Sequence, residues 1–203
     1  MNYQVVPFWL YSGQIAFLVL CAFVLGFLDM NAFAFYLLFM GIAWQLFVSL
    51  NIHSMKEKYL ILKDSDIANW LVYINGIPVK EARKELKNPS FAIEKDAVNF
   101  FLWRFMAKGM IQLFFIVLLI YQYISSHGSA ILGIKITSII LLALIVLFLC
   151  YSLFSTIKNI VFIKQGKQVI ETLVSPSSSQ WYQVHFTYDD KLLVPALSRL
   201  LSI

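Results

Sequence analysis

The sequence is poor in charged residues and in cysteine, and each shortage excludes a class of protein. Only 13% of the 203 residues are charged, whereas a soluble domain usually carries about twice that fraction. The two cysteines, Cys21 and Cys150, are expected at different depths of two helices, so they are too far apart for a disulfide. No glycine-rich phosphate loop, nucleophile elbow, zinc signature or CxxC pair is present. These shortages argue against a soluble domain and against the common enzyme classes.

What the chain has instead is four long apolar stretches, in two pairs around a charged middle segment. They cover residues 8–28, 32–50, 110–124 and 131–154. A helix needs about 20 apolar residues to cross the roughly 30 Å hydrocarbon core of a bilayer. The third stretch reaches this length only with residues 105–108 in front of it. The sequence therefore predicts an all-α polytopic membrane protein, with four transmembrane helices arranged as two hairpins.

The basic residues predict how these helices are oriented. Ten of the 16 Lys and Arg residues lie in 51–109, five follow Phe154, and Lys135 lies beside the short loop of the second hairpin. Lys and Arg are retained on the cytoplasmic side, so both termini should face the cytoplasm of a bacterial inner membrane. The first stretch has no cleavage site and is expected to be a retained helix. The predicted regions are a first transmembrane hairpin (1–50), a cytoplasmic helical segment (51–104), a second transmembrane hairpin (105–154) and a cytoplasmic tail (155–203).

Polar and ionisable groups inside the predicted spans are few. Gln14, Gln45 and Gln112 are the polar residues, and no span contains a carboxylate. Lys135 is expected at the outer interface, where its ammonium reaches the lipid head groups and helps to anchor the helix. Ion-coupled transport usually requires ionisable groups within the membrane, so it is disfavoured. A small oligomeric channel or transporter lined by the three glutamines is the alternative that stays open.

Small residues recur at four-residue spacing along the predicted spans. Such positions share one helix face and let two backbones approach closely, which drives association in a bilayer. We interpret them as packing positions of a four-helix bundle, with a homo-oligomer or a larger assembly as the second possibility. They are Ser12, Ala16, Ala22 and Gly26 in the first span, Gly41, Gln45 and Ser49 in the second, and Gly133 and Thr137 in the fourth.

The middle segment is predicted to be helical. Apolar residues at helical spacing follow Asp64-Ser65-Asp66 and end at Asn75-Gly76, which predicts a first short helix. A charged second helix is expected over residues 79–87, and a third could begin at Ser90 and run into the membrane. Acidic residues interleave with the basic ones, which argues against a nucleic acid as partner.

The end of this segment is both basic and aromatic. Arg104 and Lys108 share a helix face next to Trp103. A basic face of this kind attracts anionic head groups by about 1 kcal/mol per basic residue. We interpret these residues as a membrane anchor that sets the topology, with specific lipid recognition as the alternative.

The tail is predicted to be a small α+β unit. Gln165-Gly166-Lys167 predicts either a hairpin between residues 160–163 and 168–174, or the end of a fourth helix that continues to about Lys164. The alternation over residues 181–188 predicts a strand. We expect this strand to have an exposed edge that docks a partner. The docking residues would be Trp181, Tyr182, Val184, Phe186 and Tyr188.

No residue set supports catalysis, a metal or a cofactor. His185 lies near Asp189 and Asp190 in the sequence, but a metal or acid–base site would need further ligands. The best interpretation is a non-enzymatic bacterial inner-membrane protein that acts through protein–protein interaction with another membrane or cytoplasmic protein. It would be an accessory, assembly, exclusion or immunity component of a machine such as a secretion or conjugation apparatus. A lipid-acting membrane enzyme ranks last, after the oligomeric channel.

Overall fold

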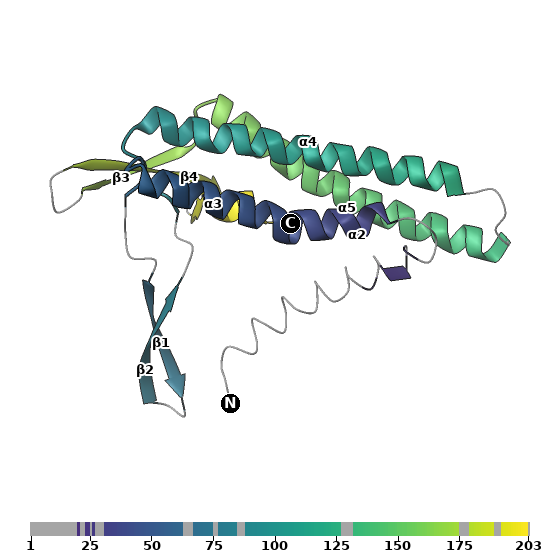
Figure 1. Cartoon of the computed structure of the whole chain (residues 1–203), viewed down its shortest axis with the longest axis horizontal. Coiled ribbons are helices and arrows are strands. Elements are labelled where there is room, and N and C mark those ends of the chain that lie inside the picture. The colour runs from purple at the N-terminus through teal and green to yellow at the C-terminus, as the bar shows by residue number, and fades with distance from the viewer. Residues whose placement is uncertain are drawn as a thin grey trace.

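The computed structural model describes most of the chain, and within it the protein is largely helical (Figure 1). The residues described are 20, 23, 24, 26, 31–62, 67–74, 77–84, 88–126, 132–174, 179–188 and 192–202. For 67–74, 77–84, 126, 132–138, 188 and 192 the description covers the backbone alone. The first predicted span, residues 8–28, lies almost wholly outside the described residues. The first span, and with it the total of four spans in two hairpins, therefore stays a prediction.

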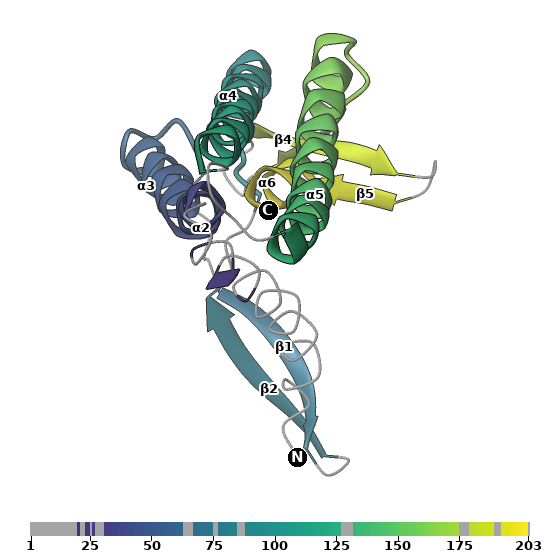
Figure 2. The ribbon, with the colours of Figure 1, turned by 90° about the vertical axis from the view of Figure 1, so that its right-hand side faces the viewer.

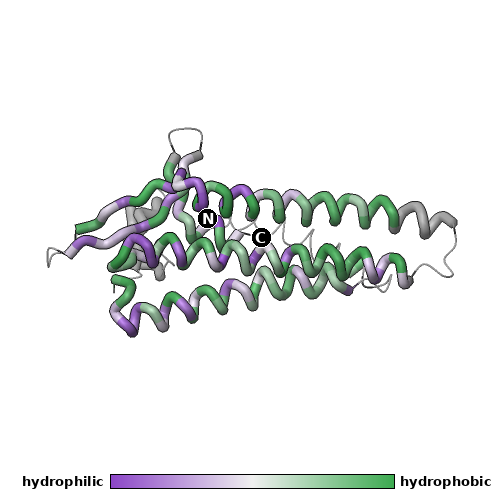
Figure 3. The backbone as a smooth tube through the Cα atoms, turned by 90° about the horizontal axis from the view of Figure 1, so that it is seen from above, coloured by the Kyte–Doolittle hydropathy of each residue, from purple (hydrophilic) through white to green (hydrophobic). Residues whose placement is uncertain are grey.

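Three described helical segments are long and apolar enough to cross a membrane: Ala32–Glu57, Glu94–Ser125 and Ile139–Lys164. Helices α4 (Glu94–Ser126) and α5 (Leu132–Lys164) have 33 residues each, which corresponds to about 50 Å at 1.5 Å per residue. This is roughly 20 Å longer than the hydrocarbon core requires. Figure 3 shows more of the hydrophilic colour toward the end of the bundle that carries the strands. The extra length therefore supports structure outside the membrane.

The first described segment contains a wider helical turn in its middle. It consists of α2 (Ala32–Leu38), the π-helix η1 (Phe39–Ala43) and α3 (Trp44–Glu57). In a regular α-helix, residues four apart drift around the axis by about 40° per step, and the π turn reverses this drift. The segment can therefore bury one residue in every four over its whole length. The buried residues are Tyr36, Met40, Trp44, Val48 and Ile52.

Helix α4 lies at the centre of the bundle, between α2 and α5 (Figure 2). One continuous stripe of α4 is buried, and it packs against α5, α2 and the tail. The buried residues of α5 include Ile145, Leu149 and Ser152. Large apolar residues on the outer faces are exposed, which suits helices whose solvent is lipid. The buried stripe of α4 is Ala97, Phe101, Phe105, Lys108, Gln112, Phe115 and Leu119.

The middle segment is a β-hairpin, so the prediction of two helices there is wrong. Strand β1 (Ile67–Ile74) pairs antiparallel with β2 (Ile77–Lys84), with Ile74 opposite Ile77. Two residues, Asn75-Gly76, separate these partners in the sequence, and this dipeptide is the strongest short-range signature of a hairpin. Reading it as a helix stop overlooked that signature and the β-branched and aromatic residues before it. Figures 1 and 2 show the hairpin projecting away from the helical bundle.

The tail forms a three-stranded antiparallel sheet and a short helix. Strands β3 (Val169–Val174), β4 (Gln180–Tyr188) and β5 (Leu192–Pro195) lie in the order β3-β4-β5, and α6 (Ala196–Leu201) follows. The predicted strand at 181–188 and the small α+β tail are confirmed. The predicted membrane-spanning helices thus carry a separate small sheet at one end.

Helix α5 continues to Lys164, which confirms one alternative and excludes the hairpin around Gln165-Gly166-Lys167. Gly166 adopts a positive φ of 67°, its N–H donates to Ile163 O, and the N–H of Lys167 donates to Phe162 O. This pair of bonds is a Schellman motif, in which a left-handed glycine closes a helix C-terminus. The glycine therefore ends the helix, and β3 starts only after it.

Strand β4 is the central strand of the sheet, and both of its sides are occupied. Strand β3 pairs with one side, and on the other side β5 pairs with residues from His185 to Tyr188. Phe91, from the loop before α4, forms a bridge to Tyr182 through two backbone hydrogen bonds of 2.8 and 2.9 Å. The expected exposed edge therefore does not lie on β4. The two outer strands are β3 and the short strand β5.

Candidate functional site

The candidate site is the junction where the tail packs on the start of α4. At its centre Lys108 is almost completely buried, with 2% of its surface exposed. Its ammonium donates hydrogen bonds to the carbonyl oxygens of Arg199, Leu200 and Ser202, at 3.3, 3.1 and 2.5 Å. The last carbonyls of a helix lack partners within the helix and carry partial negative charge. Lys108 thus caps the C-terminus of α6.

Lys108 does not lie on a surface that meets lipid head groups, which corrects its expected role as an anchor. It belongs to the buried stripe of α4, one turn after Phe105 and one turn before Gln112. A second helix assists it, because the indole Nε1 of Trp44 donates to Leu200 O at 3.3 Å. The C-terminus of α6 is consequently held by α3 and α4 together.

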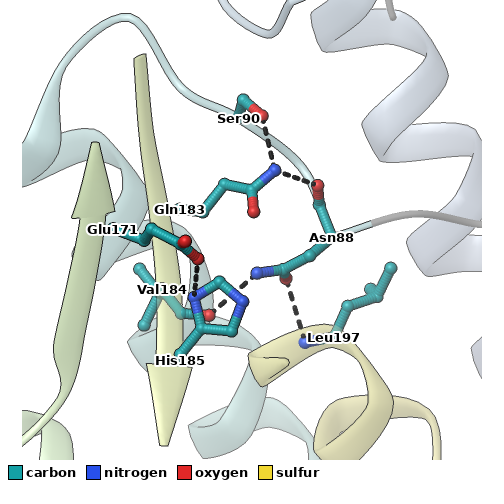
Figure 4. A network of polar contacts seen from close by, with 7 residues as sticks. All are labelled: Asn88, Ser90, Glu171, Gln183, Val184, His185 and Leu197. Carbon is teal, nitrogen blue, oxygen red and sulfur yellow. Dashed lines mark hydrogen bonds and ion pairs between the residues drawn. The ribbon is translucent and has the colours of Figure 1, made fainter. Parts of the chain in front are cut away.

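Asn88 holds the other end of α6 (Figure 4). Its Nδ2 donates to Val184 O at 2.9 Å, and its Oδ1 accepts from the backbone N–H of Leu197 at 3.4 Å. Leu197 lies in the first turn of α6, where the backbone N–H groups have no partner within the helix. Gln183 Nε2 donates to Asn88 O and to Ser90 Oγ, at 3.1 and 2.7 Å. The side chain of Asn88 therefore joins its own loop to β4 and to α6.

A helix of six residues has no stability of its own, because nucleation costs more than so few hydrogen bonds return. Here α6 is supported at both ends by residues outside it, Asn88 at the start and Lys108 at the end. Its inner face is buried through Ala196, Leu197 and Leu200. The junction thus fixes the tail rigidly to α4.

His185 is the one buried titratable side chain of the described sheet. Its Nδ1 lies 3.7 Å from Glu171 Oε2 on β3 (Figure 4) and has no hydrogen-bond partner within the described part of the chain. Asp189 and Asp190 lie outside the described residues. Within the described part of the chain, no group of three His, Cys, Asp or Glu residues could hold a metal ion. The pair is a contact between two strands.

A buried polar cluster joins α4 and α5 inside the bundle. Gln112 Nε2 donates to Ser152 Oγ at 2.8 Å, and Thr156 Oγ1 donates to Ser152 O at 3.0 Å. The buried hydroxyl of Tyr36 has no hydrogen-bond partner among the described residues. Hydrogen bonds between helices contribute about 0.6 kcal/mol each in a membrane. Gln112 is internal while Gln45 is exposed, so the structure does not bring these two together along one polar path.

The remaining predicted anchor residues have different environments. Trp103 is 66% exposed on the outer face of α4. Arg104 is half-buried, and its guanidinium lies 3.4 Å from the centre of the Phe100 ring. Its Nη1 also donates to Phe100 O at 3.2 Å. For Lys135 only the backbone, within α5, is described.

The predicted packing residues are only partly described. Gly26, Gly41 and Ser49 are half-buried, and Gln45 is exposed. The buried residues Met40, Trp44 and Val48 each lie one position before the predicted packing residues Gly41, Gln45 and Ser49. The others lie outside the described residues (Ser12, Ala16, Ala22) or have only a described backbone (Gly133, Thr137).

Two of the five predicted docking residues of β4 are internal. Val184 and Phe186 are buried, and the Phe186 ring lies 5.9 Å from that of Phe105 on α4. Trp181 and Tyr182 are half-buried, and for Tyr188 only the backbone is described. The buried side chains of β4 therefore belong to the packing of the sheet on the bundle and do not lie on its surface.

Sequence reasoning missed Asn88, Trp44 and the buried position of Lys108. Asn88 directly follows the helix expected over residues 79–87, and nothing local indicates its contacts with residues about a hundred positions away. Lys108 could have been found, because it continues the buried spacing of Phe101 and Phe105 toward Gln112. Comparison of the chain with models of known protein families, with curated proteins and with solved structures finds no match.

Proposed function

We propose that this chain is a multi-pass protein of the bacterial inner membrane that works by binding another protein through its cytoplasmic tail, without a catalytic step. The observation that carries the proposal is the free outer edge of β3, since no described strand pairs with that side. Five of the six residues of β3 are exposed. The partner would supply an extended segment that adds to the sheet.

An unpaired edge presents a row of backbone donors and acceptors, and proteins usually protect it with lysine, proline or a bulge. Strand β3 has neither lysine nor proline, and Glu171 is its one charged residue. Val174 is 72% exposed, Val169 37% and Leu173 36%. Such an edge suits strand addition, in which backbone bonds supply affinity and side chains supply specificity.

The attachment of the sheet to the helical bundle supports the same function. Asn88 and Lys108 fix α6, and the Phe91 bridge fixes β4, so the sheet has one position relative to α4. A partner bound at β3 is thereby linked directly to the membrane helices. This is what an accessory, assembly, exclusion or immunity component of a secretion or conjugation apparatus requires. In the proposed topology both termini lie in the cytoplasm.

The proposal is tested by photo-crosslinking in native membranes. A photoreactive amino acid at Val174, on β3, should give a specific protein adduct, while the same group at Leu193, on the short strand β5 at the opposite edge, should not. Leu173→Lys places a charge beside the edge and should abolish the adduct. Unchanged size-exclusion elution of this variant shows that it folds. Equal adducts from Val174 and Leu193 would reject strand addition at β3. The absence of any adduct from Val174 in cells whose function requires the protein would reject it as well.

A further inference from the structure

A cavity of about 210 Å³ lies between α5, the end of β4 and α6, on a different part of the tail from the β3 edge. Figure 2 shows α5 running beside α6 and this side of the sheet. Its polar lining residues are Lys158, Arg199, Ser155, Asn159 and Thr187, and none of the described lining residues is acidic. The described lining thus combines two cations with several neutral hydrogen-bonding groups, which suits an anion.

The cavity lies at the depth of the membrane boundary. Lys158 is the first charged residue of α5 after Lys135. The two are 23 residues apart, which is about 35 Å along a helix, slightly more than the roughly 30 Å thickness of the hydrocarbon core. Lys158 therefore belongs at the level of the lipid head groups if the apolar part of α5 fills the membrane.

An exposed apolar stripe leads along α5 to the cavity. Leu144, Leu147, Tyr151 and Phe154 are 59%, 66%, 75% and 66% exposed, and Lys158 follows four residues after Phe154. Steps of three and four residues keep all five positions on one helix face. Tyr151 and Phe154 also line the cavity itself. The surface is thus apolar on the membrane side and cationic at its end. This order matches the apolar chains and the anionic head group of a phospholipid.

We propose that this cavity binds the phosphate of an anionic phospholipid of the cytoplasmic leaflet. The head group lies between Lys158 and Arg199, the side chains of Ser155, Asn159 and Thr187 supply hydrogen bonds, and the acyl chains follow the stripe of α5. An arginine guanidinium donates to two phosphate oxygens at once, and basic pockets beside transmembrane helices on the cytoplasmic side are typical head-group sites. This site is separate from the β3 edge and does not depend on a protein partner.

The test measures lipid retained by the purified full-length protein. The protein is reconstituted in phosphatidylcholine vesicles with and without phosphatidylglycerol, extracted in mild detergent, and its bound lipid is determined by native mass spectrometry. Wild type should retain phosphatidylglycerol in preference to phosphatidylcholine. Lys158→Gln should weaken retention about fivefold, from a contribution of one cation near the surface. Lys164→Gln is the matched control, an exposed lysine of the same helix outside the cavity.

The outcomes separate the lipid from other sources of phosphate. Equal retention of both lipids, or equal losses in Lys158→Gln and Lys164→Gln, would overturn the site, because surface charge alone would then explain the binding. Displacement of the lipid by glycerol phosphate at comparable concentration would assign the cavity to a soluble phosphate instead. Arg199→Lys keeps the charge but loses the two-pronged contact, and it should weaken retention without unfolding α6. Because no readout involves a protein partner, failure here and failure at β3 are distinguishable.

Discussion

Replacing Lys108 by methionine should release α6 from the bundle while the helices stay folded. Methionine has a similar length and no charge, so the change removes three hydrogen bonds to carbonyl oxygens and little volume. Hydrogen bonds from a charged donor contribute about 1.5–3 kcal/mol, and unpaired buried carbonyls cost about 1–3 kcal/mol. The variant also avoids the cost of keeping an ammonium away from water. We expect a net loss of about 2–3 kcal/mol, since the desolvation term offsets part of the hydrogen-bond loss.

Hydrogen–deuterium exchange measures this loss locally. Amides of α6 should exchange about 30- to 150-fold faster in Lys108→Met, because each 1.4 kcal/mol corresponds to a factor of ten. Amides in the middle of α4, around Phe115, should not change, since the buried stripe there is intact. Lys95→Met is the matched control, because Lys95 is an exposed lysine of the same helix. Unchanged exchange in α6 would show that Lys108 does not hold it, and the reasoning about the junction would be refuted.

Three further changes test other parts of the structure. Asn88→Ala should speed hydrogen–deuterium exchange at the first turn of α6 and lower the stability by about 1–2 kcal/mol, because two hydrogen bonds are lost. Asn88→Asp keeps the acceptor for the N–H of Leu197 and should have a smaller effect. Gly166→Ala should lower the free energy of unfolding by about 1–2 kcal/mol in thermal melts, because alanine is strained at positive φ and its methyl group would contact nothing. Gly109→Ala is the control and should be neutral, because its methyl group would make ordinary contacts with Thr156. Gln112→Leu should shift the melting temperature little, because it removes one interhelical bond worth about 0.6 kcal/mol and also an unpaired buried oxygen.

The sequence predicts those elements that depend on local patterns. The apolar lengths predict the three described spans, the alternation over 181–188 predicts β4, and Gly166 marks the end of α5. Each of these signals is contained within a few helical turns or one strand. The hairpin of β1 and β2 was missed for a different reason, because its apolar residues also fit helical spacing and Asn75-Gly76 suits both a helix end and a turn.

The junction could not be predicted because its contacts join distant residues. Asn88 bonds to Val184 and Leu197, and Lys108 bonds to Arg199, Leu200 and Ser202, about ninety to a hundred positions away. A lysine at the end of an apolar stretch normally indicates the membrane boundary. Whether such a residue instead caps a distant helix depends on where the tail packs. That information is tertiary, and periodicity in the sequence does not contain it.

The unbroken length of α4 has a mechanical consequence. Sharp bends in helices arise almost always at proline, at glycine or at irregular turns, and between Glu94 and Ser126 the sequence contains no proline and one glycine, Gly109. The charged start of this helix carries the sheet through Phe105 and Lys108, while its apolar end packs against α2 and α5. A rotation or tilt of α4 should therefore displace the β3 edge together with the helix, since the two are parts of one packed unit.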